Sequence, residues 1–226
     1  MDTSPILVVG GRTGIGAAVA EWFPERAVVW SRSTGVDATD PESVARGTEQ
    51  LIAARGTPWA VVHTVGDFDE ESLLETSDAH YRHMVESNLT TAFVVLRALT
   101  PHLVAAERGR IVLFGAAGVS DATAKSRSPV YFAVKAAVVS LARSLARDVA
   151  ASGVTVNVVS PGIIRHPDSH ATSQDRMQVL VPAGRAGTVD DCRSTIEWLL
   201  SPASGYVTGE EIVVDGGLRL GADPRW

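Results

Sequence analysis

Tyr131 and Lys135 are the residues of this sequence whose types and spacing most clearly suggest chemistry. Residues four apart in a helix lie one turn apart on the same face, so this phenol and ammonium would be neighbours. A free tyrosine has a pKa near ~10, and an adjacent positive charge lowers it by favouring the phenolate. The pair is a candidate proton donor with its pKa-lowering neighbour. An exposed tyrosine and a solvated lysine are the alternative.

The spacing of residues around this pair predicts a helix over 128–151. Ser128 is a good N-cap, because its hydroxyl oxygen can accept an amide proton of the first turn, and Pro129 suits the first helical position. Apolar residues then recur at helical spacing and predict one buried stripe. They are Val134, Val138, Leu141, Leu145 and Val149.

A short apolar run, Ile6–Val9, is followed by Gly10, Gly14 and Gly16 and then by a helical pattern. Strand, glycine turn and helix together favour a nucleotide site. Glycines let the backbone approach a pyrophosphate, and the helix N-terminus supplies amide donors and a positive dipole. A tight turn that needs one positive φ is the alternative.

Ser31 and Arg32 follow the second apolar run, Ala27–Trp30, where a dinucleotide fold selects its cofactor. An acidic residue there would bind a ribose 2′-hydroxyl, whereas a guanidinium pairs with a 2′-phosphate. Arg32, together with Arg12 in the glycine turn, therefore favours NADP(H) over NAD(H). An ordinary surface arginine at a strand end is the alternative.

Composition narrows the class of protein. The chain has 226 residues, a net charge of −6, 45% hydrophobic residues and a single cysteine, Cys192. The charge argues against nucleic-acid binding and against a polybasic membrane patch. We expect no membrane span, no signal peptide, no metal site and a cytoplasmic location. The pairs His80/His83 and His166/His170 have metal-ligand spacing, but we expect solvated or loop histidines, because no companion carboxylate cluster is evident.

Strand patterns alternate with helical patterns along the whole chain, which predicts an α/β fold. We expect one Rossmann-type domain over residues 1–226, a doubly wound parallel sheet with helices on both faces. Ligands then bind at the carboxyl ends of the strands. A helix expected over 77–105 contains Asn88, a poor residue for a helix interior, which suggests a local kink or a surface position.

In this order and spacing, the motifs jointly resemble those of the short-chain dehydrogenase/reductase family over nearly the whole chain. Gly10, Gly14 and Gly16 look like its cofactor motif, and Tyr131 with Lys135 looks like its catalytic pair. The remaining matches are Asp37-Ala38, Asn88, Asn157 with Pro161-Gly162, Thr208-Gly209 and Asp215-Gly216-Gly217.

The resemblance implies a mechanism in which Tyr131 protonates a carbonyl oxygen while the nicotinamide gives hydride to the carbon. Lys135 would bind the nicotinamide ribose and lower the pKa of Tyr131, and Asn88 would hold a water in a proton relay. The implied catalytic residues are Tyr131, Lys135 and Asn88. The implied cofactor-binding residues are these three with Gly10, Arg12, Thr13, Gly14, Ile15, Gly16, Ser31, Arg32, Asp37, Ala38, Thr64, Val65, Gly66, Pro161, Gly162 and Ile164.

Three positions depart from the family pattern. His63-Thr64-Val65-Gly66 replaces Asn-Asn-Ala-Gly, which keeps the glycine and loses the asparagine contacts. Ala116 stands where the catalytic serine is expected and cannot donate a hydrogen bond; Ser120 or Ser126 could substitute. Arg165-His166 replaces the usual threonine region.

The leading hypothesis is an NADP(H)-dependent oxidoreductase acting on a small-molecule carbonyl, alcohol or imine. A dehydratase or epimerase with the same fold is one alternative, and a catalytically impaired nucleotide-binding protein, as Ala116 suggests, is another. The resemblance also implies a homodimer or homotetramer, and Ala133, Ala136 and Ala137 would permit close helix packing between subunits. Residues 166–181 are expected to cover the substrate site.

Overall fold

The computed structural model describes residues 3–121, 124–165 and 178–221. The strands are β1 (Ile6–Val9), β2 (Ala27–Trp30), β3 (Ala60–His63), β4 (Gly109–Phe114), β5 (Val154–Pro161), β6 (Ile164–Arg165), β7 (Gly187–Thr188) and β8 (Glu211–Val214). The helices are α1 (Gly14–Trp22), α2 (Pro41–Arg55), α3 (Asp78–Val85), α4 (Thr91–Ala105), α5 (Pro129–Val149) and α7 (Val189–Leu200).

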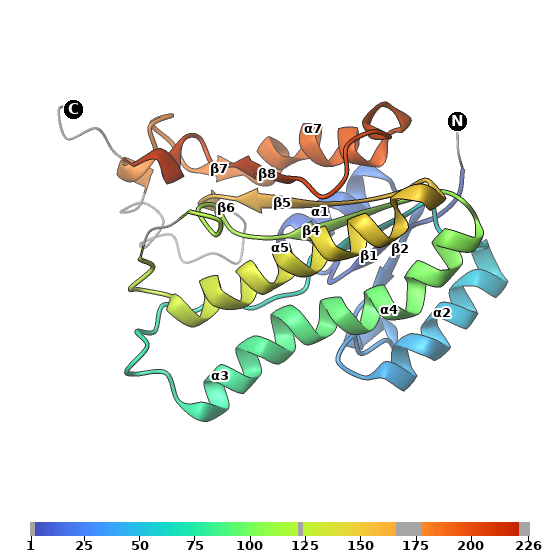
Figure 1. Cartoon of the computed structure of the whole chain (residues 1–226), viewed down its shortest axis with the longest axis horizontal. Coiled ribbons are helices and arrows are strands. Elements are labelled where there is room, and N and C mark those ends of the chain that lie inside the picture. Colours follow the sequence, from blue (N-terminus) through green and yellow to red (C-terminus); the bar gives the residue numbers. More distant parts are fainter. Residues whose placement is uncertain (1–2, 122–123, 166–177, 222–226) are drawn as a thin grey trace.

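Six of the strands form one sheet in the order β2-β1-β3-β4-β5-β8, and every neighbouring pair is parallel. Helices α2, α4 and α5 cover one face, and α1 and α7 cover the other (Figure 1). A separate ladder of two short strands pairs β6 with β7. The predicted α/β class and the doubly wound parallel sheet are confirmed, while the domain extent of 1–226 stays a prediction.

The strands are short apolar runs because both faces of the sheet are covered. In β1, Leu7 and Val9 pack toward α2, α4 and α5, while Ile6 and Val8 pack toward α1 and α7. All four side chains are at most 1% exposed. Period-2 alternation thus divides one continuous apolar run between two cores.

Helix α5 packs its buried stripe against β4 and β5. Val134, Val138 and Val149 are buried as predicted, but Leu141 and Leu145 are only half-buried. The smaller side chains of Ala142 and Ala146 complete the stripe at 1% and 2% exposure. Small side chains let the helix approach the sheet closely, and the two leucines lie at the edge of the contact.

The stretch Pro129–Ser152 is long and apolar enough to cross a membrane by length and composition alone, which the sequence prediction missed. Its stripe of core residues explains the composition, because a helix packed on a sheet passes the same test. Only 39% of its most apolar part is buried, so much of the helix lies outside the core.

The predicted side-chain cap of α5 is wrong. Ser128 occupies the N-cap position, but its hydroxyl makes no capping hydrogen bond. Ser128 Oγ instead donates to the carbonyl oxygen of Asp69 at 2.7 Å. This bond ties the start of α5 to the segment after β3.

The helix predicted over 77–105 is interrupted at Asn88 by a π-helical turn, Glu86–Thr90, between α3 and α4. Asn88 Nδ2 donates to Met84 O at 3.1 Å and to Asp67 O at 3.0 Å. A side-chain amide that bonds backbone carbonyls competes with the regular helix ladder, which accounts for the extra residue in this turn.

Candidate active site

The carboxyl ends of β1, β3, β4 and β5 lie along one edge of the sheet, where the predicted residues gather. Gly10 follows β1 at φ +92°, and a Cβ added there would lie 2.9 Å from Thr64 Oγ1 and 2.9 Å from the Val65 side chain. A Cβ on Gly16 would lie against the same Thr64 hydroxyl and 2.7 Å from Gly10 O. Thr64 and Val65 thus pack directly on the glycine turn, and only glycine fits at these two positions.

The N-terminus of α1 is open to an anion. Thr13 precedes the helix in extended conformation and makes no side-chain capping bond, and no acidic residue lies in the first turn. The amides of Gly14, Ile15 and Gly16 lie in that first turn, and Arg12 is exposed beside it. A helix N-terminus with free amides is suited to a pyrophosphate. These residues therefore fit a dinucleotide.

The loop after β2 provides the adenosine side of the predicted site. Gly10 N donates to Trp30 O at 2.9 Å, which brings the glycine turn beside the end of β2. Ser31 and Arg32 follow, and Arg32 is exposed. Hydrogen bonds from Thr39 and, to a lesser extent, the positive charge of Arg32 lower the pKa of Asp37. Ala38, the next residue, is buried.

Gly66, Asn88, Lys135 and Tyr131 come together from three elements. A Cβ on Gly66 would lie 3.0 Å from Lys135 Nζ and still closer to Asn88 Oδ1. Lys135 Nζ donates to Phe114 O at 3.1 Å and lies 5.8 Å from the centre of the Tyr131 ring. Asn88 Oδ1 is buried without a hydrogen-bond partner among the described residues. The predicted catalytic residues are thus neighbours.

The protonation states of the pair differ from the sequence expectation. Burial lowers the pKa of Lys135 to about 8, and the Asp67 carboxylate partly opposes this shift. Burial raises the pKa of Tyr131 to about 12, so the net shift is opposite to the lowering expected from Lys135. Desolvation of the phenolate outweighs the nearby ammonium in this arrangement. At neutral pH the Tyr131 phenol is therefore protonated, as an ordinary tyrosine is.

His63, at the end of β3, is a neighbour of Lys135 that sequence reasoning missed. Its side chain is 3% exposed, and Nε2 has no hydrogen-bond partner within the described residues. Burial and then the positive charge of Lys135 lower the pKa of His63 to about 3. A neutral imidazole therefore stands where the family pattern has asparagine. Its position at the end of a buried strand was the available signal.

The position of the expected serine is occupied by buried Ala116, just beyond β4. Ser120 Oγ donates to the carboxylate of Glu211 in β8, and Ser126 is exposed. Among the described residues, no hydrogen bond joins Ser120 or Ser126 to Tyr131. That either of them replaces the serine therefore stays a prediction.

Pro161 and Gly162 close the far side of the site. Ala117 N donates to Pro161 O, and Gly162 N donates to Val214 O, both at 2.9 Å. A Cβ on Gly162 would lie 2.8 Å from Asp215 Cβ. Ile164 lies in β6 and lines a cavity of about 150 Å³. Residues 166–177, including the predicted His166/His170 pair and most of the predicted cover, lie outside the described part of the chain.

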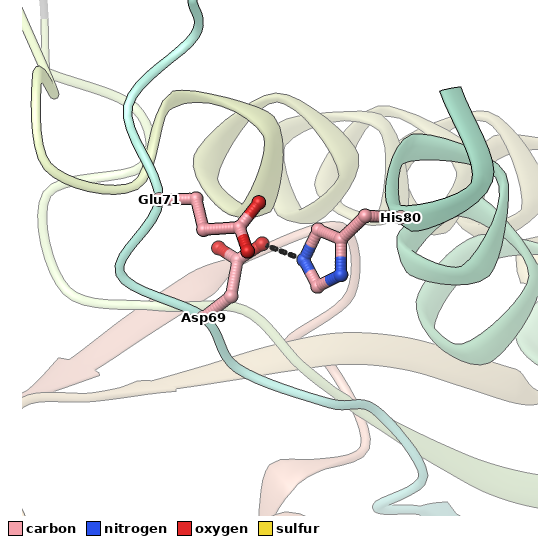
Figure 2. Close-up of side chains that lie close together, drawn as sticks. All are labelled: Asp69, Glu71 and His80. Atoms are coloured by element: carbon pink, nitrogen blue, oxygen red, sulfur yellow. Dashed lines mark hydrogen bonds and ion pairs between the residues drawn. The ribbon is translucent and has the colours of Figure 1, made fainter. Parts of the chain in front are cut away.

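The expectation that His80 and His83 lack companion carboxylates is wrong. His80 Nε2 bonds the Asp69 carboxylate, and His83 Nε2 lies 2.7 Å from Asp67 Oδ2. Glu71 joins the first of these pairs (Figure 2). The segment after β3 folds back onto α3, which spacing along the sequence did not indicate.

Residues 17–219 match the sequence profile of the family described as Enoyl-(Acyl carrier protein) reductase. The chain is 31% identical over 237 aligned positions to 3-oxoacyl-[acyl-carrier-protein] reductase FabG of Escherichia coli (strain K12), covering 95% of this chain and 96% of the relative. It is 30% identical to 3-oxoacyl-[acyl-carrier-protein] reductase MabA of Mycobacterium avium, covering 96% and 90%.

Two solved structures have the same fold. A short-chain type dehydrogenase/reductase from Mycobacterium ulcerans has a TM-score of 0.85 at 26% identity, covering 98% of this chain and 91% of the other. The structure of ElxO with NADP bound has a TM-score of 0.86 at 22% identity, covering 95% of this chain and 98% of the other. By sequence and fold, the chain belongs to the short-chain dehydrogenase/reductase family of oxidoreductases.

Proposed function

We propose that this protein reduces a carbonyl group with NADPH, and that Tyr131 is its general acid. The observation that carries the proposal is the position of Tyr131 beside Lys135, with Asn88 and Gly66 next to Lys135, at the same sheet edge as the glycine turn.

When bound, the nicotinamide supplies hydride to the carbonyl carbon. The Tyr131 hydroxyl donates its proton to the carbonyl oxygen as negative charge develops there. The Lys135 ammonium stabilises the resulting phenolate, and Asn88 holds the turn that keeps Gly66 and Lys135 together. Gly10, Thr13, Gly14, Ile15 and Gly16 receive the pyrophosphate, with Thr64, Val65, Pro161, Gly162 and Ile164 along the nicotinamide side.

NADPH is proposed over NADH because Ser31 and exposed Arg32 follow β2 without an acidic residue at the strand end. A guanidinium pairs with a 2′-phosphate through two parallel hydrogen bonds. The exposed Arg12 adds a second positive charge at the glycine turn. Asp37 and Ala38 are proposed to bound the adenine.

A 3-oxoacyl thioester is the first substrate class to test, since the named relatives are 3-oxoacyl-[acyl-carrier-protein] reductases. Ala116 offers no hydroxyl to the substrate oxygen. Loss of one such donor costs roughly 100- to 1,000-fold in turnover when nothing replaces it. The dehydratase, epimerase and impaired-protein alternatives are not favoured, because these relatives are named as reductases.

We also propose that the protein forms a homodimer or homotetramer whose subunits pack through α4 and α5. We propose a cytoplasmic location for it. An open groove of about 530 Å³ runs between these helices, lined by Leu89, Phe93, Ala137, Leu141 and small polar residues. Phe93 is 47% exposed. Ala133 and Ala136 are exposed on the same helix, so a second copy could approach closely. Light scattering that gives a monomer mass would refute this part.

Titration with NADPH and NADH, followed by tryptophan fluorescence, tests the cofactor. We expect tighter binding of NADPH, and a preference that Arg32→Ala removes. Absence of binding by either nucleotide would overturn the reductase proposal.

Oxidation of NADPH in the presence of acetoacetyl thioesters and simple ketones tests the reaction. Tyr131→Phe is the matched control, because it removes the hydroxyl and keeps the ring that contacts Phe68. We expect turnover to fall at least ~100-fold in this variant while NADPH binding is retained. Full turnover in Tyr131→Phe would exclude Tyr131 as the general acid.

A further inference from the structure

Asp69, Glu71 and His80 form a cluster next to the site but separate from its predicted residues. Asp69 and Glu71 lie in the segment after β3, and His80 lies in α3 (Figure 2). One ligand atom from each residue lies within 4.8 Å of the other two. Figure 2 shows the two carboxylates side by side at the imidazole edge. The cluster joins two segments that are distinct in sequence.

Asp69 gives an independent indication that this cluster binds a positively charged ligand. Its side chain is only 9% exposed, and one carboxylate oxygen bonds His80 Nε2. The other oxygen, Oδ1, is buried and has no hydrogen-bond partner within residues 3–121, 124–165 and 178–221. A buried carboxylate oxygen without a donor or cation is unfavourable. The unpartnered oxygen therefore points to a missing positive ligand.

The charges of the cluster lead to the same conclusion. Two carboxylates face one imidazole, so even a protonated His80 leaves a net negative charge. A divalent cation that replaces the His80 proton balances both carboxylates. Imidazole nitrogen with carboxylate oxygen suits zinc and its first-row neighbours, whereas magnesium and calcium prefer oxygen ligands alone.

We propose that Asp69, Glu71 and His80 bind one divalent transition-metal ion, and that zinc fits this donor set best. Three protein ligands leave a fourth tetrahedral position for water or another ligand. The ion would fasten the segment after β3 to α3.

This segment is in direct contact with the start of the catalytic helix. Asp69 O accepts the Ser128 Oγ bond at 2.7 Å, and the Phe68 ring lies 4.9 Å from the Tyr131 ring. An ion at Asp69 would therefore hold the segment that contacts Ser128 and the Tyr131 ring.

Zinc binding to the full chain, freed of any affinity tag and treated with EDTA, tests the proposal directly. We expect one Zn²⁺ per chain in competition with a chromogenic chelator, and a visible absorption band on titration with Co²⁺. His80→Ala and Asp69→Asn should each weaken zinc binding at least ~10-fold. Zinc at about 100 times its Kd should raise Tm by roughly 5–10 °C in the unmodified chain.

His83→Ala is the matched control. His83 is on the same helix and pairs with a carboxylate, but its side chain is 55% exposed and it lies outside the cluster. Its loss should leave zinc affinity unchanged. Circular dichroism verifies folding of each variant, and the half-exposed Glu71→Gln replaces any variant that does not fold.

Absence of saturable zinc binding in the unmodified chain would overturn the proposal. Binding that is unchanged in His80→Ala and Asp69→Asn would overturn it as well, because the ion would then be held elsewhere. Neither readout needs NADPH or a substrate. Failure of the metal proposal and failure of the reductase proposal are therefore distinguishable.

Discussion

The buried imidazole of His63 should make the protein sensitive to mild acid. The pKa of His63 is about 3 in the folded chain and 6.5 for a free imidazole. Between these values the unfolded chain binds the proton and the folded chain does not, so stability is lost as pH falls below about 6.5. At pH 5 this linkage amounts to about 2 kcal/mol relative to pH 7. A folded pKa anywhere below about 4 gives nearly the same figure.

The assay is urea unfolding near pH 7 and near pH 5 at one fixed protein concentration, for the unmodified chain and for His63→Asn. Asparagine does not titrate, so the variant should lose about 2 kcal/mol less than the unmodified chain between the two conditions. Any constant cost of the substitution cancels in this difference, as do the contributions of His80 and the carboxylates. Equal losses in the two proteins, within ~0.5 kcal/mol, would refute a neutral buried His63.

Three further outcomes are expected. Ala116→Ser should raise kcat by roughly 10-fold or more, because it restores a hydrogen-bond donor to the substrate oxygen. Ala117→Ser, one residue along, should not raise kcat. Steady-state kinetics compare the two variants, and equal effects would contradict the assignment of position 116 to the family's serine. The Lys135 ammonium loses its proton as pH rises through about 8, so kcat/KM for reduction should fall above that pH. In a pH-rate profile, Lys135→Arg should move this fall to higher pH. A profile of the unmodified protein that stays flat to pH ~10 would contradict this role of Lys135. Phe93→Glu should shift the mass measured by light scattering toward the monomer, and an unchanged oligomer would place the interface elsewhere.

Local patterns indicated the alternation of strands and helices but not the contacts between these elements. Asp40 caps α2 by accepting a hydrogen bond from Glu42 N at 2.9 Å, and the two partners are only two residues apart. Ser128 was expected to act in the same way, but its hydroxyl is taken by a carbonyl 59 residues earlier. A competing partner so far along the chain leaves no trace in the local sequence.

The same reasoning explains two other features, in or beside the site, that the sequence did not indicate. The pKa of Tyr131 is raised by burial. This burial depends on packing against other segments, such as the Phe68 ring, and not on the four-residue spacing to Lys135. The Asp69, Glu71 and His80 cluster joins a loop and a helix, so no single periodicity relates its members. The glycine turn was predictable because the residues that define it, Gly10 to Gly16, are seven consecutive residues.

The π-helical turn at Asn88 also sets the rotation of α4 about its axis relative to α3. One inserted residue advances an α-helix by about 100°, so α4 faces the core in a different rotational setting from the one α3 would impose. Deleting a single residue from Glu86–Thr90 would regularise the ladder and rotate one half of the arm against the other. Either the apolar stripe of α4 would then leave the sheet, or His80 and His83 would swing away from Asp69 and Asp67. The irregular turn thus keeps the buried face of α4 in phase with the face of α3 that meets the segment after β3.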